Sequence, residues 1–146
     1  LHSTSRRQRQ MCIRDRIMNT TTDFQKQQIM ECYERLRKFV SDMDIEDENV
    51  YYDIRNMIEV KKIALPTAVY KAMMNFMDQV VEPYVFEDTT EIFSEEEAER
   101  NEKGIVEIKS EQAFQKLMVR FMEKLSELDA KIETFAESEL KPYLER

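Results

Sequence analysis

Apolar side chains recur every three or four residues along most of this chain, the spacing that places them on one face of an α-helix. The first such stretch runs from Ile29 to Met43. Before it, Thr22 and Gln25 have the spacing of a capping box, in which two side chains bond the free backbone N–H groups of a helix start. The pattern predicts a helix that begins after Thr22 and ends near Met43, where the acidic run 42–48 predicts a turn.

Three further helices follow from the same pattern. The spacing predicts a second helix over 47–62 and a third that begins at Pro66 and that Pro83 ends or kinks. The last, over 110–141, is predicted to be the longest. Its apolar positions repeat in alternating steps of four and three, which is typical of a coiled-coil-like buried seam. That seam consists of Phe114, Met118, Phe121, Leu125, Leu128, Ile132 and Phe135.

These elements predict a mainly α protein, an antiparallel helical bundle of about four helices. One Gly and three Pro leave little material for the turns of a large sheet. The β-prone runs 84–87 and 105–108 are nevertheless candidates for a short two-stranded pairing. Between them, the spacing of Ser94 and Glu97 predicts a short helix over 95–102 that Gly104 closes.

The first seventeen residues differ from the rest. Residues 1–17 contain five Arg and one Asp, whereas the chain from Met18 onward carries a net charge of −12 within a total of −8. The run SRRQRQMCIRDR resembles the translated read-through of a sequencing adapter found in metagenomic assemblies. We therefore interpret 1–17 as a non-native, disordered leader, and 18–146 as a single helical-bundle domain with an acidic insert over 87–102.

The acidic balance bears on partners and location. Direct nucleic-acid binding needs clustered Lys and Arg, and anionic membrane surfaces disfavour an acidic protein. No apolar run is long enough for a membrane-spanning helix. Cys32 is the one cysteine after Met18, which favours the reducing cytoplasm. The composition favours a protein partner with a basic surface and is also compatible with a homo-oligomer.

Known catalytic patterns are incomplete. The chain after Met18 has no His and one Cys, so no Ser–His, Cys–His or Cys–His zinc arrangement forms, and we assign no catalytic residue, metal ligand or cofactor. Asp42, Asp44, Glu46 and Asp53 approach the spacing of a calcium loop, but Asp47 stands where that loop needs Gly.

A second group of carboxylates matches a known metal-binding motif only in part. Glu95, Glu96 and Glu99 resemble the E-E-x-x-E motif of the all-helical nucleotide pyrophosphohydrolases, which use magnesium. The matching E-x-x-D on a following helix is missing. The ordinary interpretation of this spacing is a solvated acidic turn.

The candidate interaction residues are acidic and aromatic. The insert 87–102 contains eight acidic residues and one base, and within it we single out Glu95, Glu96, Glu97 and Glu99. Tyr51 and Tyr52 are adjacent, so on a helix one of them is expected to be partly exposed beside the 42–48 acids, where it could anchor a partner. The methionines of the last two helices fill core gaps or line an adaptable surface.

The leading hypothesis is a non-catalytic acidic helical bundle that binds another macromolecule. One alternative is a phage-type decoy or inhibitor that imitates nucleic-acid charge against a basic host enzyme. Another is a nucleotide hydrolase that uses carboxylates and a divalent metal. The last is a small-ligand sponge, which needs several bases to converge, namely Arg55, Lys61, Lys62 and Lys71.

Overall fold

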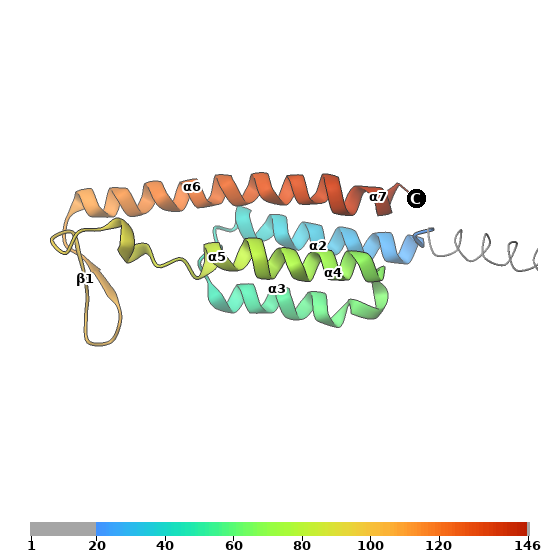
Figure 1. Cartoon of the computed structure of the whole chain (residues 1–146), viewed down its shortest axis with the longest axis horizontal. Coiled ribbons are helices and arrows are strands. Elements are labelled where there is room, and N and C mark those ends of the chain that lie inside the picture. The colour runs from blue at the N-terminus through green and yellow to red at the C-terminus, as the bar shows by residue number, and fades with distance from the viewer. Residues whose placement is uncertain (1–19, 146) are drawn as a thin grey trace, which may run out of the picture.

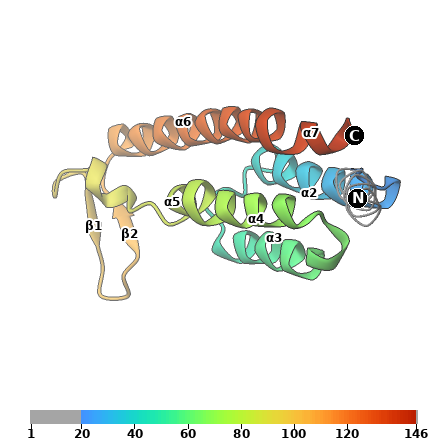
Figure 2. The ribbon, with the colours of Figure 1, turned by 45° about the vertical axis from the view of Figure 1, so that its right-hand side comes forward.

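The computed structural model describes residues 20–145, so the proposed leader lies outside the described residues. Within that range the protein is mainly α, as predicted: four long helical segments follow one another in alternating directions, and a two-stranded hairpin projects beyond them (Figures 1 and 2). The long elements are α2 (Asp23–Ser41), α3 (Glu48–Val60), α4 (Thr67–Phe76) and α6 (Glu111–Phe135).

Shorter elements extend or connect these helices. The π-helical segment η2 (Met77–Val81) leads from α4 into α5 (Glu82–Val85), and η4 (Ala136–Leu140) leads from α6 into α7 (Lys141–Leu144). The connections contain the 3-10 turns η1 (Lys62–Ala64) and η3 (Thr89–Ile92). The hairpin is formed by β1 (Ala98–Arg100) and β2 (Val106–Ile108).

The helix starts follow local chemistry. Thr22 caps α2 with the predicted capping box: its Oγ1 accepts from the Gln25 N–H, and Gln25 Oε1 accepts from the Thr22 N–H, both at 3.0 Å. Asp47 caps α3 by accepting from the backbone N–H groups of Asn49 and Val50. The acidic run after α2 therefore turns the chain, and its last member starts the next helix.

Two prolines lie inside helical segments that continue past them. Pro83 and Pro142 each follow a π-helical segment, η2 and η4. Proline lacks an N–H and its ring clashes with the carbonyl four residues earlier, and a widened π turn accommodates both defects. The third helix consequently does not end at Pro83 but runs on to Val85.

The core fills the space between the four helical segments. Phe76 and Phe135 stack with ring centroids 4.4 Å apart and join α4 to α6. The residues that are fully buried come from all four long segments and include Ile29, Phe39, Ile54, Met73, Leu128 and Ile132. One contiguous core therefore holds the bundle together.

The last helix is the longest, as predicted, but its seam is buried only in part. Leu125, Leu128, Ile132 and Phe135 are buried, whereas Phe114 is 52% exposed and Met118 is 43% exposed. The reason is visible in Figures 1 and 2: α6 extends well past the ends of α2 and α3, so among the described residues no long helix of the bundle lies beside its N-terminal half. The prediction of a seam buried along its whole length was wrong.

Two predictions for the segment between α5 and α6 were also wrong. Residues 84–85 belong to α5, because Tyr84 and Val85 are buried as the helix continues, so the strand that pairs with 106–108 is β1 and not 84–87. Residues 95–102 form no helix: one turn after Ser94 leads directly into β1. Gly104 lies in the hairpin loop with φ +78°, a conformation that glycine adopts freely.

Candidate interaction surface

The part of the molecule beyond the ends of α2 and α3 forms a distinct unit, which we call the distal lobe. It comprises residues 87–123, that is η3, the hairpin and the N-terminal half of α6 (Figure 1). The lobe contains eleven acidic and five basic residues. The two strands pair antiparallel, with Ala98 opposite Ile108 and Arg100 opposite Val106. The lobe is therefore a strongly acidic extension of the bundle.

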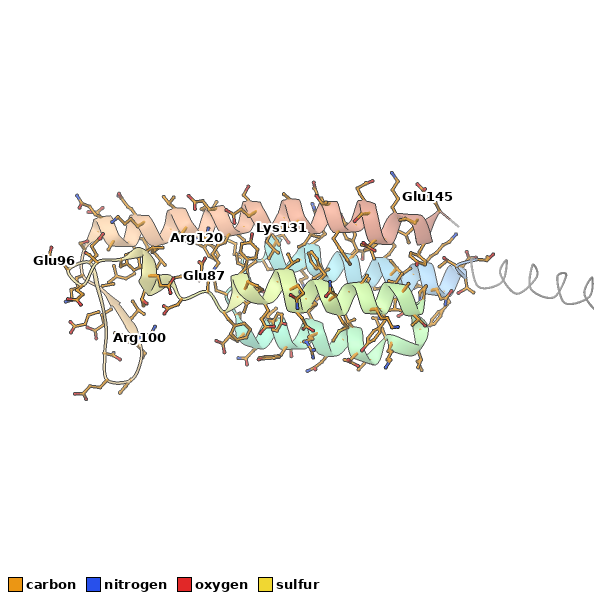
Figure 3. All side chains as sticks on the ribbon, viewed as in Figure 1. Glu87, Glu96, Arg100, Arg120, Lys131 and Glu145 are labelled. Carbon is orange, nitrogen blue, oxygen red and sulfur yellow. The ribbon has the colours of Figure 1, made fainter. Side chains whose placement is uncertain are left out.

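A cluster of ion pairs holds the beginning of the lobe against α6. Glu87 accepts hydrogen bonds from both Nε and Nη2 of Arg120, one of them from Nε to Oε2 at 3.0 Å, and Figure 3 shows the two side chains facing each other where the chain leaves α5. These bonds lower the pKa of the Glu87 carboxyl and raise the pKa of Arg120. The bidentate arrangement fixes both groups and is strong for a partly exposed pair.

Lys124 completes this cluster from within the protein. Its side chain is only 1% exposed, and its Nζ lies 2.9 Å from Glu46 Oε1 and 3.6 Å from Glu87 Oε2. One buried ammonium thus joins the turn after α2, the start of the lobe and α6. Because a buried charge needs its partners, the cluster is a structural junction between bundle and lobe. Because the Lys124 side chain is buried, a substrate has no access to its ammonium group.

A second set of polar contacts organises the hairpin. Lys116 of α6 lies 2.7 Å from Glu97, and this bond lowers the pKa of the Glu97 carboxyl. Lys109 lies 2.9 Å from Glu99 across the two strands. The loop is held by Asn101, whose side-chain oxygen accepts from the N–H groups of Lys103 and Ile105. These ion pairs and hydrogen bonds therefore hold the hairpin in shape and against α6.

The four glutamates singled out in the sequence all lie in the lobe but differ in their surroundings. Glu95 and Glu96 are exposed and form no ion pair within residues 20–145, and Figure 3 shows Glu96 at the far end of the molecule. Glu97 and Glu99 are occupied by Lys116 and Lys109. Six further acids of the lobe that were not singled out are also exposed: Asp88, Glu91, Glu102, Glu107, Glu111 and Glu123.

The tyrosine pair divides between core and surface. Tyr51 is 1% exposed and its hydroxyl donates to the Met77 carbonyl of η2 at 3.4 Å. Burial raises the pKa of Tyr51 to about 12. Tyr52 is 50% exposed and packs edge-on to Phe86, which is 39% exposed. Sequence reasoning missed Phe86, because it assigned this residue to a strand. The two exposed rings lie where α3 begins and the lobe leaves α5.

A groove of about 820 Å³ runs between α5 and α6 and bears on the small-ligand hypothesis. Phe76 and Phe135 line its apolar part. Its two cations are already engaged: Arg120 is bonded to Glu87, and the Lys131 ammonium lies 4.9 Å above the ring of Tyr84, whose hydroxyl donates to Glu127 at 3.0 Å. The groove therefore presents no free cation for an anionic ligand.

Three of the four bases that a ligand sponge requires do not converge. Arg55 pairs with Asp78 at 3.0 Å, and Lys61 pairs with Glu31 at 2.6 Å. Lys62 lies over the Tyr70 ring at 5.1 Å. Each cation is thus paired with a different group, and no common anion site forms among these three.

The described side chains that could bind a metal ion or act as a nucleophile are likewise not gathered into one site. Within the described range, no three His, Cys, Asp or Glu side chains lie close enough to hold a metal ion together. Glu46, from the calcium-like spacing, is bonded to Lys124. Cys32 is fully buried, and burial raises the pKa of its thiol to about 11, so the thiolate is scarce at neutral pH.

The sequence matches no protein family, and neither curated proteins nor solved structures give a significant match. Among residues 20–145, no helix has both the length and the apolar character needed to cross a membrane.

Proposed function

We propose that this protein is a non-catalytic binding protein that recognises a partner protein with a basic surface through its acidic distal lobe. The observation that carries the proposal is the position of the unpaired glutamates. Glu91, Glu95, Glu96 and Glu102 are exposed and make no ion pair within the described residues, and all four lie on the unit that projects from the bundle. The same proposal places the protein in the cytoplasm, since Cys32 is a free thiol.

Charge placed at the end of a rigid frame suits recognition. Like charges on one lobe repel each other, and a cationic partner relieves that repulsion. Such complementarity accelerates association and weakens as salt screens it, because the Debye length falls to about 8 Å at physiological ionic strength. The exposed rings of Tyr52 and Phe86 beside the lobe add contact area of the kind that anchors interfaces.

Poly-L-lysine is the probe for this proposal, with a lobe variant and a matched control. The lobe variant carries Glu→Gln at 91, 95, 96 and 102. The control carries Glu34→Gln, Asp53→Asn, Glu82→Gln and Glu139→Gln, four exposed carboxylates of the bundle. Both remove four charges, and both spare the Glu87 and Glu97 ion pairs. Circular dichroism melting confirms the fold of each.

We expect the lobe variant to bind poly-L-lysine about tenfold more weakly at low salt, since each exposed ion pair contributes about 0.2–1 kcal/mol. The control is expected to change affinity by less than about twofold. An equal loss in both variants would mean that only the net charge of the chain matters, and the proposal would fail.

A further inference from the structure

The N-terminal half of α6 exposes an apolar face, which we call the open face. Phe114, Met118 and Met122 follow one another at intervals of four residues and therefore lie on one side of the helix. They are 52%, 43% and 53% exposed, and Val119 beside them is 57% exposed. Contiguous exposed apolar side chains of this size are typical of a surface that binds another protein.

The open face continues the buried seam of the bundle. Further along α6, Leu125, Leu128 and Ile132 are buried among the other helices. The change occurs at Lys124, where the ion pair with Glu46 fixes the turn that follows α2. Within residues 20–145 none of the long helices of the bundle lies beside α6 beyond this turn, as Figures 1 and 2 show; only the short η3 and the hairpin accompany it there. The face thus has the pattern of a helix–helix interface that the described part of the chain does not cover.

The helix that bears the open face is held in place from its other side. Ala113 is fully buried, β2 contacts α6, and Arg120 is bonded to Glu87. The exposed residues consequently belong to a fixed surface. Two of them are methionines, whose flexible thioethers adapt to different partner shapes.

The charge of the lobe determines which kind of partner can bind the open face. Both bases of α6 before Lys124 are bonded to carboxylates of the lobe, Lys116 to Glu97 and Arg120 to Glu87. Glu111 and Glu123 stay exposed on the same stretch, within a lobe of eleven acids and five bases. A second copy of this chain would bring the same negative excess, and the two lobes would repel each other. A cationic helix meets the opposite field.

We propose that the open face binds an amphipathic helix of a partner protein, with an apolar side flanked by Lys and Arg, that lies along α6 beyond the end of α2. This inference rests on the proposed function and specifies its partner. The anchors Phe114, Met118 and Met122 span nine residues, or about 12 Å of helix, so two to three turns of the partner cover them. Apolar residues at i, i+3 or i+4, and i+7 of such a helix match this surface.

Three synthetic peptides of about 18 residues test the proposal with the full chain. The first carries Leu on one helical face and Lys on the other. The second has the same composition in an order without an apolar face, and the third replaces each Lys of the first with Glu. The protein variant is Met118→Ser with Met122→Ser. Its control is Val60→Ser with Ile63→Ser, two side chains that are 80% and 97% exposed, the first at the end of α3 and the second in η1.

We expect the amphipathic Lys peptide to bind about tenfold more tightly than the scrambled one, a preference that is lost in the Met118/Met122 variant and kept in the control. The Glu peptide is expected not to bind. Fluorescence anisotropy gives the affinities, and circular dichroism confirms that both variants fold. Equal binding of the two Lys peptides, or a preference that survives in the Met118/Met122 variant, overturns the inference.

Two further outcomes show whether this inference fails alone or together with the proposed function. If poly-L-lysine binding depends on the lobe glutamates but the amphipathic peptide shows no preference, the proposed function stands and the helix-binding face fails. Sedimentation velocity covers the other occupant: a wild-type dimer that the Met118/Met122 variant dissociates would show that a second copy covers the open face, and the proposal would be wrong.

Discussion

At the scale of single residues, the end of α2 shows how a glycine-poor chain solves a local problem. The backbone N–H of Asp44 donates to the Phe39 carbonyl at 3.1 Å and that of Met43 to the Val40 carbonyl at 3.0 Å. This is the bonding of a Schellman motif, whose central residue adopts a left-handed conformation and is usually glycine. Here that residue is Met43, with φ 61°, and its side chain is 58% exposed.

Met43→Gly is therefore expected to stabilise the protein. A left-handed conformation costs a residue with a Cβ about 1–2 kcal/mol, and the exposed side chain loses little packing, so we expect a net gain of about 1 kcal/mol in the free energy of unfolding. Urea denaturation measures it. The matched control is Met30→Gly, in the interior of α2, where the same substitution is expected to cost about 1 kcal/mol. A loss of stability in Met43→Gly would contradict the assignment of strain.

The two ends of α2 also show what sequence alone predicts. The capping box of Thr22 and Gln25 was predicted correctly because it depends only on two side chains three residues apart. The left-handed Met43 was not, because its side chain gives no turn signal of the kind that Gly or Asn gives. That conformation is required only by the two backbone hydrogen bonds, from Met43 and Asp44, that close the C-terminal end of α2.

At the scale of elements, periodicity predicted the helices better than it predicted what covers them. The steps of four and three between Phe114 and Phe135 are continuous in sequence, yet burial begins only near Phe121 and Leu125. A helix-period pattern reports an apolar face, and whether a neighbour reaches that face depends on where the other helices end. Here α2 ends at Ser41 and α3 begins at Glu48 after a turn. Beyond that turn α6 continues with only the shorter elements of the lobe beside it.

The two halves of the seam are expected to differ in their contribution to stability. Leu128→Ala removes a fully buried side chain, and we expect a loss of about 2–5 kcal/mol in the free energy of unfolding. Phe114→Ala removes a larger side chain that is half exposed, and the expected loss is under about 0.5 kcal/mol. Urea denaturation of both variants checks this. Similar losses at both sites would mean that Phe114 is buried in solution, for example by self-association.

The hairpin was located only in part, for a physical reason. The second strand, 106–108, was identified from its β-branched residues, but β1 consists of Ala98, Glu99 and Arg100, which have little β propensity. Its pairing comes from the loop, where Asn101 bonds two backbone N–H groups and Gly104 is left-handed. The Asn-x-x-Gly spacing was the available signal. The run 84–87 instead follows the helix, because burial against the bundle outweighs β propensity.

At the scale of the whole molecule, the bundle and the distal lobe are held by different forces. The contiguous core draws its buried residues from 29–85 and 125–140 and includes none between them. The lobe is joined to the bundle by the continuous helix α6 and by Lys124, which pairs with Glu46 and Glu87. In contrast, Glu87 with Arg120 and Glu97 with Lys116 hold the parts of the lobe to one another. A unit with few buried apolar contacts opens at a lower free energy than a packed core. The candidate surface therefore lies on the less stable part of a stable protein.

At acidic pH, the lobe is expected to open before the bundle unfolds. The paired bases lower the pKa of both Glu87 and Glu97 below the ordinary value of 4.5. The folded state binds these protons less readily than the unfolded state, so both contributions are complete above pH 4.5 and are lost as the pH falls through the lowered values. Hydrogen-exchange mass spectrometry is expected to show falling protection in 88–110 below pH 4.5, while the core of α2 and α3 stays protected.

The variant Glu87→Gln with Glu97→Gln reproduces the protonated state at neutral pH. We expect it to reduce protection in 88–110 at pH 7 to the level that the wild type reaches in acid, because neutral amides cannot form the ion pairs with Arg120 and Lys116. Glu137→Gln is the control, since it breaks an ion pair with Lys141 at the opposite end of α6 and is expected to leave the lobe unchanged. If acid or the double variant instead lowered protection of lobe and bundle together, the two parts would unfold as one unit, and the ion pairs would not be what separates their stabilities.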